Sequence, residues 1–130
     1  QHTAGEFKAA ATEFQWVVDN MPASALYADS LFGLAAAQSA LGDHATATKL
    51  YSQILEKHTG EKSLSNRAKY GRAVANVQQG EYKSAAADLR DYLKSAEKGS
   101  QTSEARYLLG YALAAEKSYD EAITTLQALL

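Results

Sequence analysis

The feature that most constrains this chain is a pattern that recurs four times at spacings of 37 and 38 residues. Each copy starts with a turn or small residue, followed two residues later by a position that is aromatic in three copies. An alanine comes three residues later, and large apolar residues follow it at four, seven and eight. The turn column is Gly5, Gly42, Gly80 and Lys117, and the alanine column is Ala10, Ala47, Ala85 and Ala122. Such an internal repeat predicts a stack of equivalent units.

The spacing inside each copy predicts helices, because it follows the apolar stripe of a helix and not the alternation of a strand. A single proline in 130 residues supports this. The pattern predicts one set of helices over Phe7–Asp19, His44–Lys57, Tyr82–Ala96 and Tyr119–Leu130. Between them we expect three more, over Ser24–Leu41, Leu64–Gln79 and Ser103–Glu116. These share small residues in register, Ala35, Ala73 and Gly110, where neighbouring helices can approach closely.

Short links join the helices within a unit, which predicts antiparallel neighbours. Gly42 and Gly80 suit a left-handed helix C-cap. Asp43 and Ser118 are suited to the N-cap of the helices that follow, and Ser118 with Glu121 has the spacing of a capping box.

Helix pairs of about this period, with small residues at their contacts, are typical of the tetratricopeptide repeat family, which the chain resembles over essentially its whole length. The segment from Glu104 to Leu130 matches best, with Leu109, Gly110, Tyr119 and Ala122 where the motif places them. The resemblance implies an all-α, right-handed solenoid of antiparallel helix pairs with about seven helices. We expect one array over 1–130: a second helix of a truncated unit (1–22) and three units (23–60, 61–98 and 99–130).

The chain departs from the family pattern in two ways. Its period exceeds the usual ~34 residues. Its first helices carry polar residues at usually apolar positions: Gln38, Lys69, Arg72 and Asn76. The long period and the helix start after Pro22 resemble bacterial envelope members, such as outer-membrane assembly lipoproteins and Tol–Pal accessory proteins, which favours the periplasm or envelope over the cytoplasm. Because the first and last helices lack polar caps, we expect either flanking repeats in a longer protein or pairing of these ends with another copy.

Composition argues against several functions. The net charge is −2 and the basic residues are scattered, so nucleic acid is not an expected partner. There is no cysteine, and no apolar run is long enough to span a membrane. His2, His44 and His58 do not have metal-ligand spacing, and His44 is interpreted as a packing residue in the aromatic column. Carboxylates such as Glu56, Glu61, Asp88 and Asp91 are expected on solvated helix faces. We therefore expect no enzyme, no metal and no cofactor.

Binding is the favoured activity, through the concave face that the first helices of such an array line. An aromatic stripe there suits an extended or helical peptide, although the alternative is that some of these rings pack between helices. The apolar character of this face argues against the carboxylate clamp with which some family members hold chaperone tails. The predicted contact residues are Phe32, Ala36, Arg67, Tyr70, Val74, Glu104, Tyr107 and Tyr111; Asp29, Ser39, Val77 and Ala114 are expected to face the same way.

Three functions remain open from the sequence. The favoured one is a scaffold that binds a partner protein or peptide. The alternatives are a homo-oligomer built through the apolar terminal helices, and a docking or regulatory domain of a larger enzyme. Trp16, the only tryptophan, either covers the boundary between units or stays exposed as a candidate contact.

Overall fold

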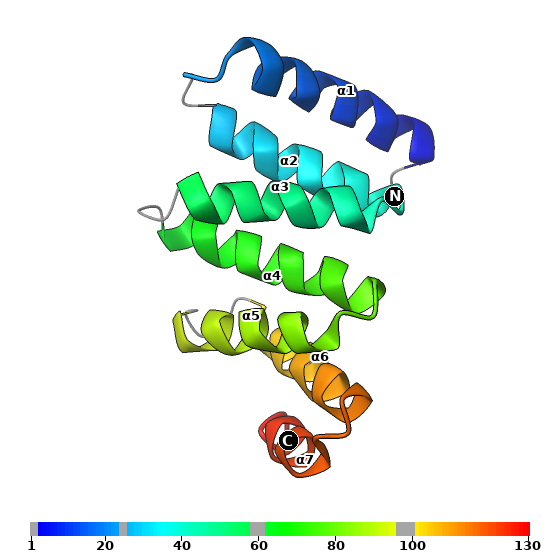
Figure 1. Ribbon diagram of the computed structural model, residues 1–130, viewed down its shortest axis with the longest axis vertical. Coiled ribbons are helices and arrows are strands. Elements are labelled where there is room, and N and C mark those ends of the chain that lie inside the picture. Colours follow the sequence, from blue (N-terminus) through cyan, green and yellow to red (C-terminus); the bar gives the residue numbers. More distant parts are fainter. Residues whose placement is uncertain (1–2, 24–25, 58–61, 96–100) are drawn as a thin grey trace. The chain divides into compact units, whose positions relative to one another are not determined.

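The computed structural model describes residues 3–23, 26–57, 62–95 and 101–130, and all regular secondary structure in these ranges is α-helix (Figure 1). The helices are α1 (Ala4–Asn20), α2 (Tyr27–Ala40), α3 (His44–Lys57), α4 (Lys62–Gln78), α5 (Tyr82–Ser95), α6 (Thr102–Ala115) and α7 (Tyr119–Gln127). The all-α prediction is confirmed, with each expected helix present. Helix α7 ends at Gln127, three residues before the predicted end, and the predicted ends at Ser24 and Ala96 lie outside the described residues.

The chain forms two compact units, Gln1–Ala68 and Lys69–Leu130, with the boundary inside α4. In the first unit α2 packs between α1 and α3. In the second unit α6 packs between α5 and α7. We call α2, α4 and α6 first-type helices, because each is the first helix of a predicted repeat unit, and α1, α3, α5 and α7 second-type helices. Each compact unit therefore has the same arrangement, with a first-type helix packed between two second-type helices. The handedness and the repeat boundaries expected from the sequence stay predictions.

The three short turns have one geometry, which explains the turn column of the repeat. Gly42, Gly80 and Lys117 have φ of 91°, 78° and 64°. In each turn the next residue donates its N–H to a carbonyl five residues earlier, as in Asp43 to Gln38 at 2.8 Å and Ser118 to Leu113 at 2.8 Å. This is the Schellman pattern that closes a helix with a left-handed residue. The predicted glycine C-caps are confirmed at Gly42 and Gly80, whereas Gly5 lies inside α1.

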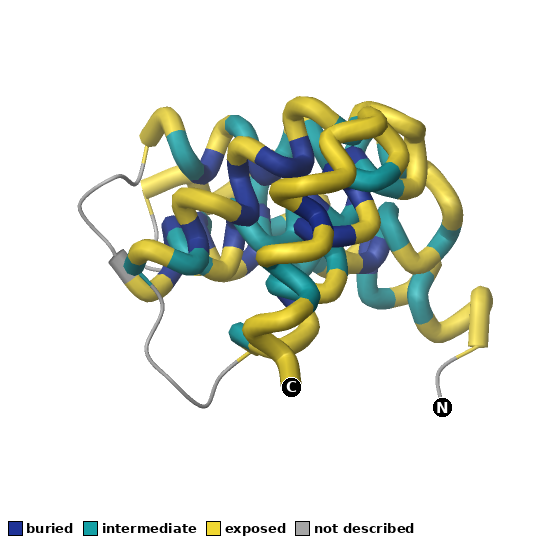
Figure 2. Tube along the Cα trace, turned by 90° about the horizontal axis from the view of Figure 1, so that it is seen from below, coloured by how far each residue is buried: buried dark blue, intermediate teal, exposed yellow. Residues whose placement is uncertain are grey.

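Three of the four alanines in the alanine column lie in the cores, where a larger side chain would hold the helices apart, and Ala10 is half-buried. Ala47 and Ala85 are fully buried and Ala122 nearly so. Two glycines mark still closer approaches. A Cβ on Gly33 would lie 2.6 Å from Cζ of Phe14, and a Cβ on Gly110 would lie 2.5 Å from Cγ of Leu126. Figure 2 shows the buried residues as short stretches along helices that are otherwise half-buried or exposed.

The expectation that Asp88 is a solvated carboxylate is wrong. Its side chain is 9% exposed and accepts two hydrogen bonds from Arg72, from Nε to Oδ2 and from Nη2 to Oδ1, each 2.7 Å long. Arg72 belongs to α4 and Asp88 to α5, so the pair joins the two helices. The polar Arg72, which departs from the family pattern, is thus neutralised by a carboxylate on the neighbouring helix.

The two predicted N-caps have different outcomes. Asp43 caps α3, since its Oδ1 accepts the Thr46 N–H at 3.2 Å. These hydrogen bonds with Thr46 hold the pKa of Asp43 below its ordinary value of 3.8. The capping box predicted at Ser118 is wrong, because the Ser118 side chain makes no capping bond and Glu121 instead binds Arg90.

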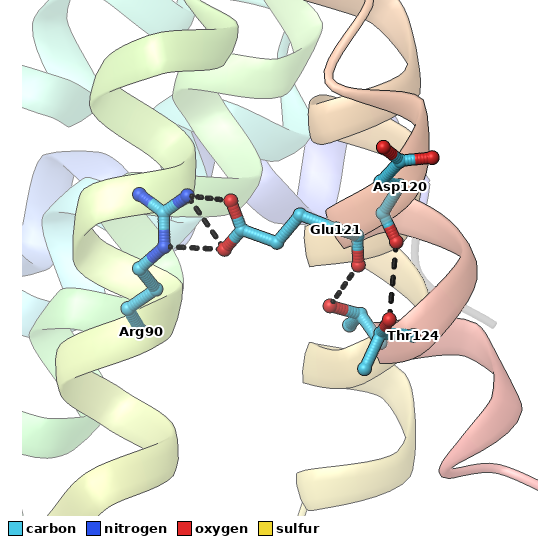
Figure 3. Close-up of polar contacts among 5 residues, drawn as sticks. Arg90, Asp120, Glu121 and Thr124 are labelled. Atoms are coloured by element: carbon cyan, nitrogen blue, oxygen red, sulfur yellow. Dashed lines mark hydrogen bonds and ion pairs between the residues drawn. The ribbon is translucent and has the colours of Figure 1, made fainter.

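Figure 3 shows the reason: the Glu121 carboxylate extends away from its own backbone toward the guanidinium of Arg90 on α5. Nη2 of Arg90 lies 2.8 Å from Oε2 of Glu121, and Nε donates to the same oxygen at 3.1 Å. A capping box does form at α1, where Thr3 and Glu6 exchange hydrogen bonds and start the helix before the predicted Phe7.

Candidate functional site

The solvent-exposed face of α6 in the second unit carries two tyrosines, which lie beside a hollow. Tyr107 is 59% exposed and Tyr111 is 48% exposed, high values for large aromatic side chains. The hollow encloses about 590 Å³, and we call it the Glu104 hollow. Its lining consists of Tyr70, Ser103, Glu104, Tyr107, Leu108 and Leu129. Glu104 is the one formal charge in this lining, so the hollow is apolar and aromatic with an acidic edge.

A second hollow of about 390 Å³ lies farther along α6 and shares Tyr107 and Leu108 with the first. We call it the Tyr82 hollow; it is lined by Val77, Gln78, Tyr82, Tyr107, Leu108 and Tyr111. The rings of Tyr82 and Tyr111 meet edge to face, 5.9 Å between centroids. A hydrogen bond with Tyr111 raises the pKa of Tyr82, so Tyr82 stays protonated and neutral near pH 7.

Tyr70 forms the wall that α4 contributes to the Glu104 hollow. Its ring is half-buried against Tyr92 of α5, with 5.4 Å between centroids. Burial raises the pKa of Tyr70, and the nearby charge of Glu104 and the Tyr92 hydroxyl raise it further. Tyr70 and Glu104 both line this hollow, so the phenol and the carboxylate border the same space.

The first unit has a related aromatic pair with a different neighbour. Phe32 of α2 meets Tyr51 of α3 edge to face at 5.6 Å. The guanidinium carbon of Arg67 lies 4.3 Å from the centre of the Phe32 ring, within the range of a cation–π interaction. Burial raises the pKa of Tyr51, and the charge of Arg67 opposes that shift.

Comparison with protein families agrees with the helix-pair geometry. The sequence model of the tetratricopeptide repeat matches residues 32–100 and 77–130. The chain belongs to the tetratricopeptide repeat family. Repeats of this family generally mediate protein–protein interactions, so a binding face is the site to look for. A comparison with curated proteins finds no significant match.

Six of the eight predicted contact residues of this tetratricopeptide chain lie in pairs or larger groups, each group inside one unit. Tyr70, Glu104 and Tyr107 share one hollow, Tyr107 and Tyr111 share the other, and Phe32 and Arg67 stack in the first unit. The two other residues are Ala36, which is exposed on α2, and Val74, which is half-buried on α4 outside both hollows.

Sequence reasoning missed Leu108, which lines both hollows. A signal was present in the repeat itself. Leu108 occupies the column that holds Gly33 and Gly71 in the earlier units, so only the third unit has a large apolar side chain there. Tyr82 was expected only as a member of the aromatic packing column, yet its ring also lines a hollow.

Trp16 is 58% exposed, so the exposed alternative is correct and the packed one is wrong. It lines a hollow of about 440 Å³ in the first unit, between α1 and α2. Leu34 and Gln38 lie on its α2 side. This is a second place on the repeat surface where an aromatic side chain is available.

Of the three histidines, the structure describes only His44. His44 is half-buried, and its Nδ1 lies 3.2 Å from Oγ of Ser39, in agreement with a packing role at the start of α3. His2 and His58 lie outside the described residues. Across the described ranges, no three His, Asp or Glu side chains come together as metal ligands would. Nor does any helix there combine the length and apolar character of a membrane span.

Proposed function

We propose that this chain binds a segment of a partner protein along the exposed face of α6, which the sequence predicts to belong to the concave surface, and that it has no catalysis of its own. The observation that carries the proposal is the pair of exposed tyrosines flanking two hollows on one helix. Tyrosine supplies large, rigid contact area at low entropic cost and is enriched among residues that dominate binding energy. About half of each of these two side chains is exposed, so both rings offer surface that a partner could cover.

The chemistry of the two hollows favours a protein segment over a nucleic acid. Their walls are aromatic and aliphatic, with single hydroxyl, amide and carboxylate groups at the edges. The one formal charge, Glu104, repels phosphate. A peptide with an apolar side chain for each hollow matches this arrangement.

The resemblance of the repeat period and the helix starts to bacterial envelope proteins indicates in which compartment a partner could be found. We propose that the partner is a protein of the bacterial envelope, as for the assembly and Tol–Pal accessory members that the long period resembles. Phe32, Ala36 and Arg67 in the first unit and Val74 in the second belong to the proposed contact set, with smaller contributions than the α6 tyrosines because they are partly covered, small or stacked.

The test selects binders from a displayed library of random peptides and measures their affinity for variants of the chain. Replacing Tyr107 and Tyr111 together by alanine should weaken the selected peptides by about 30-fold or more, since each aromatic anchor contributes about 1–2 kcal/mol. The matched control is Tyr119→Ala, because Tyr119 is equally exposed, at 58%, but lies on α7 outside both hollows. Equal loss in the two variants, or no loss in either, would contradict the proposal.

Self-association is a second candidate, supported by the outer face of α7. Tyr119 and Ile123 lie one turn apart there and are both more than half exposed. Their equivalents on α5, Tyr82 and Ala86, pack against the core that α6 shares. Sedimentation equilibrium distinguishes the two functions: a monomer at all concentrations argues against self-association, whereas a dimer dissociated by Ile123→Glu supports it.

A further inference from the structure

We infer that the Glu104 hollow receives an arginine side chain of the bound partner, with its guanidinium between the Glu104 carboxylate and the rings of Tyr70 and Tyr107. This deepens the proposed function and rests on it. It specifies the chemistry of one anchor of the partner segment.

The first observation is that the molecule already holds an arginine at the equivalent place in the first unit. Phe32 packs on a tyrosine of the following helix, and Arg67 from the next first-type helix covers the Phe32 ring at 4.3 Å. An aromatic pair with a guanidinium over it is therefore an arrangement that this repeat geometry accommodates.

The second observation is the register of the repeat. Phe32, Tyr70 and Tyr107 occupy one column, and Asp29, Arg67 and Glu104 occupy another. In the second unit Tyr70 again packs on a tyrosine of the following helix, Tyr92. The residue in the column of Arg67 is now Glu104, so a carboxylate stands where the first unit supplies a cation.

The third observation is that this carboxylate is available. Glu104 is exposed at the edge of the hollow, and it forms no hydrogen bond or ion pair with any residue that the structure describes. Its charge acts on Tyr70, whose pKa is raised first by burial and then by Glu104. Two tyrosine rings and this carboxylate form a cation site to which none of the described residues contributes a cation.

Arginine fits this site better than lysine. Its planar guanidinium stacks on aromatic faces and binds a carboxylate through two parallel N–H groups, whereas the lysine ammonium is a strongly hydrated point charge. The volume of about 590 Å³ also leaves room for an apolar neighbour of the arginine against Leu108 and Leu129.

The experiment follows the ring signals of Tyr70 and Tyr107 by NMR while the peptide acetyl-Leu-Arg-Leu-amide is added to the chain. The control peptides carry citrulline, which keeps the shape but removes the charge, or lysine. We expect saturable shifts with the arginine peptide, and binding about tenfold weaker with citrulline and several-fold weaker with lysine. Equal binding of the arginine and citrulline peptides, or no saturable shift at either ring, would overturn the inference.

Variants of the chain test whether the Glu104 carboxylate is the charge that binds the arginine peptide. Glu104→Gln should weaken the arginine peptide about tenfold, and Glu116→Gln, an exposed change on the far end of the same helix region, should leave it unchanged. Glu104→Arg should abolish binding, because the new guanidinium would cover Tyr70 as Arg67 covers Phe32. Both positions are exposed, so circular dichroism should show intact helices. An unaltered affinity in Glu104→Gln or in Glu104→Arg contradicts the inference.

This inference and the proposed function can fail separately. If the selected peptides depend on Tyr107 and Tyr111 but the arginine peptide binds as well to Glu104→Gln as to the natural chain, the arginine site is wrong and the binding face stands. If the arginine peptide binds through Glu104 but the selected peptides ignore both tyrosines, the binding face is wrong.

Discussion

The first and second units place different chemistry at the same two positions of the repeat. In the first unit these positions hold Leu34 and Leu50, and both belong to an apolar cluster with Ala11 and Ala37. In the second unit the same columns hold Arg72 and Asp88, which form an ion pair with two hydrogen bonds of 2.7 Å. In both units the two positions lie on consecutive helices, α2 and α3 in the first case and α4 and α5 in the second.

The difference teaches that the register of the repeat fixes the backbone and leaves the contact chemistry free, provided that both partners change together. A leucine in place of Arg72 alone or of Asp88 alone would break this ion pair and keep the other charge between the two helices. Desolvation of the pair offsets much of its attraction, so the ionic contact need not be more stable than the apolar one. It does demand one specific partner, which an apolar contact does not.

The largest predicted effect comes from breaking the ion pair on one side. Asp88→Ala should lower the free energy of unfolding by about 3 kcal/mol, because it leaves the partly buried Arg72 guanidinium without its carboxylate. Urea unfolding followed by circular dichroism measures this.

The control restores the chemistry of the first unit. The double variant Arg72→Leu with Asp88→Leu should unfold within about 1 kcal/mol of the natural chain, because a matched apolar pair replaces a matched ionic one. If the double variant were as unstable as Asp88→Ala, the two units would not be interchangeable at these columns, and the comparison would fail.

The sequence predicts features that depend on neighbouring residues better than features that depend on residues far apart in the chain. The helices, the glycine turns and the Asp43 cap depend on neighbours within a few residues, and the repeat shows the helices and the turns more than once. The Ser118 capping box failed because Glu121 is drawn to Arg90, 31 residues earlier, and no local pattern records that competition. The prediction that Asp88 is solvated failed for the same reason, because its partner Arg72 lies 16 residues away on another helix.

The candidate site was partly predictable for a related reason. Counting along the first-type helices placed Tyr70, Glu104, Tyr107 and Tyr111 on one side, because a helical period carries that information. Periodicity does not record depth, so it could not indicate that Leu108 lines both hollows or that Arg67 lies over the Phe32 ring. Those facts depend on which side chains reach across between helices.

The second prediction compares the two close helix approaches. Gly110→Ala should destabilise by about 1–2 kcal/mol even after the gain in helix propensity, because the new Cβ meets Cγ of Leu126 near the root of that side chain. Gly33→Ala should cost less than about 1 kcal/mol, because the new Cβ meets the outer edge of the half-buried Phe14 ring, which can move outward.

Gly5→Ala is the control for helix propensity alone. Its nearest atom would lie 3.8 Å from the new Cβ, in ordinary contact, and α1 should gain about 0.5–1 kcal/mol. Thermal unfolding of the three variants gives their order. Equal losses at Gly33 and Gly110 would show that the two units tolerate crowding alike and would contradict this prediction.

The smallest predicted effect compares the two helix starts. Asp43→Ala should lower the unfolding midpoint by about 4 °C, because it removes the cap on α3, whereas Ser118→Ala should leave the midpoint unchanged within error.

The pKa of Asp43 is lowered in the folded state, so its contribution to stability is complete above the ordinary carboxyl pKa of 3.8 and is lost as pH falls through the lowered value. The gap between the natural chain and Asp43→Ala should therefore be constant near neutral pH and close in acid below that pKa. A gap that persists unchanged in acid, or an equal loss in Ser118→Ala, would mean that hydrogen bonding to the Asp43 carboxylate is not what distinguishes the two starts.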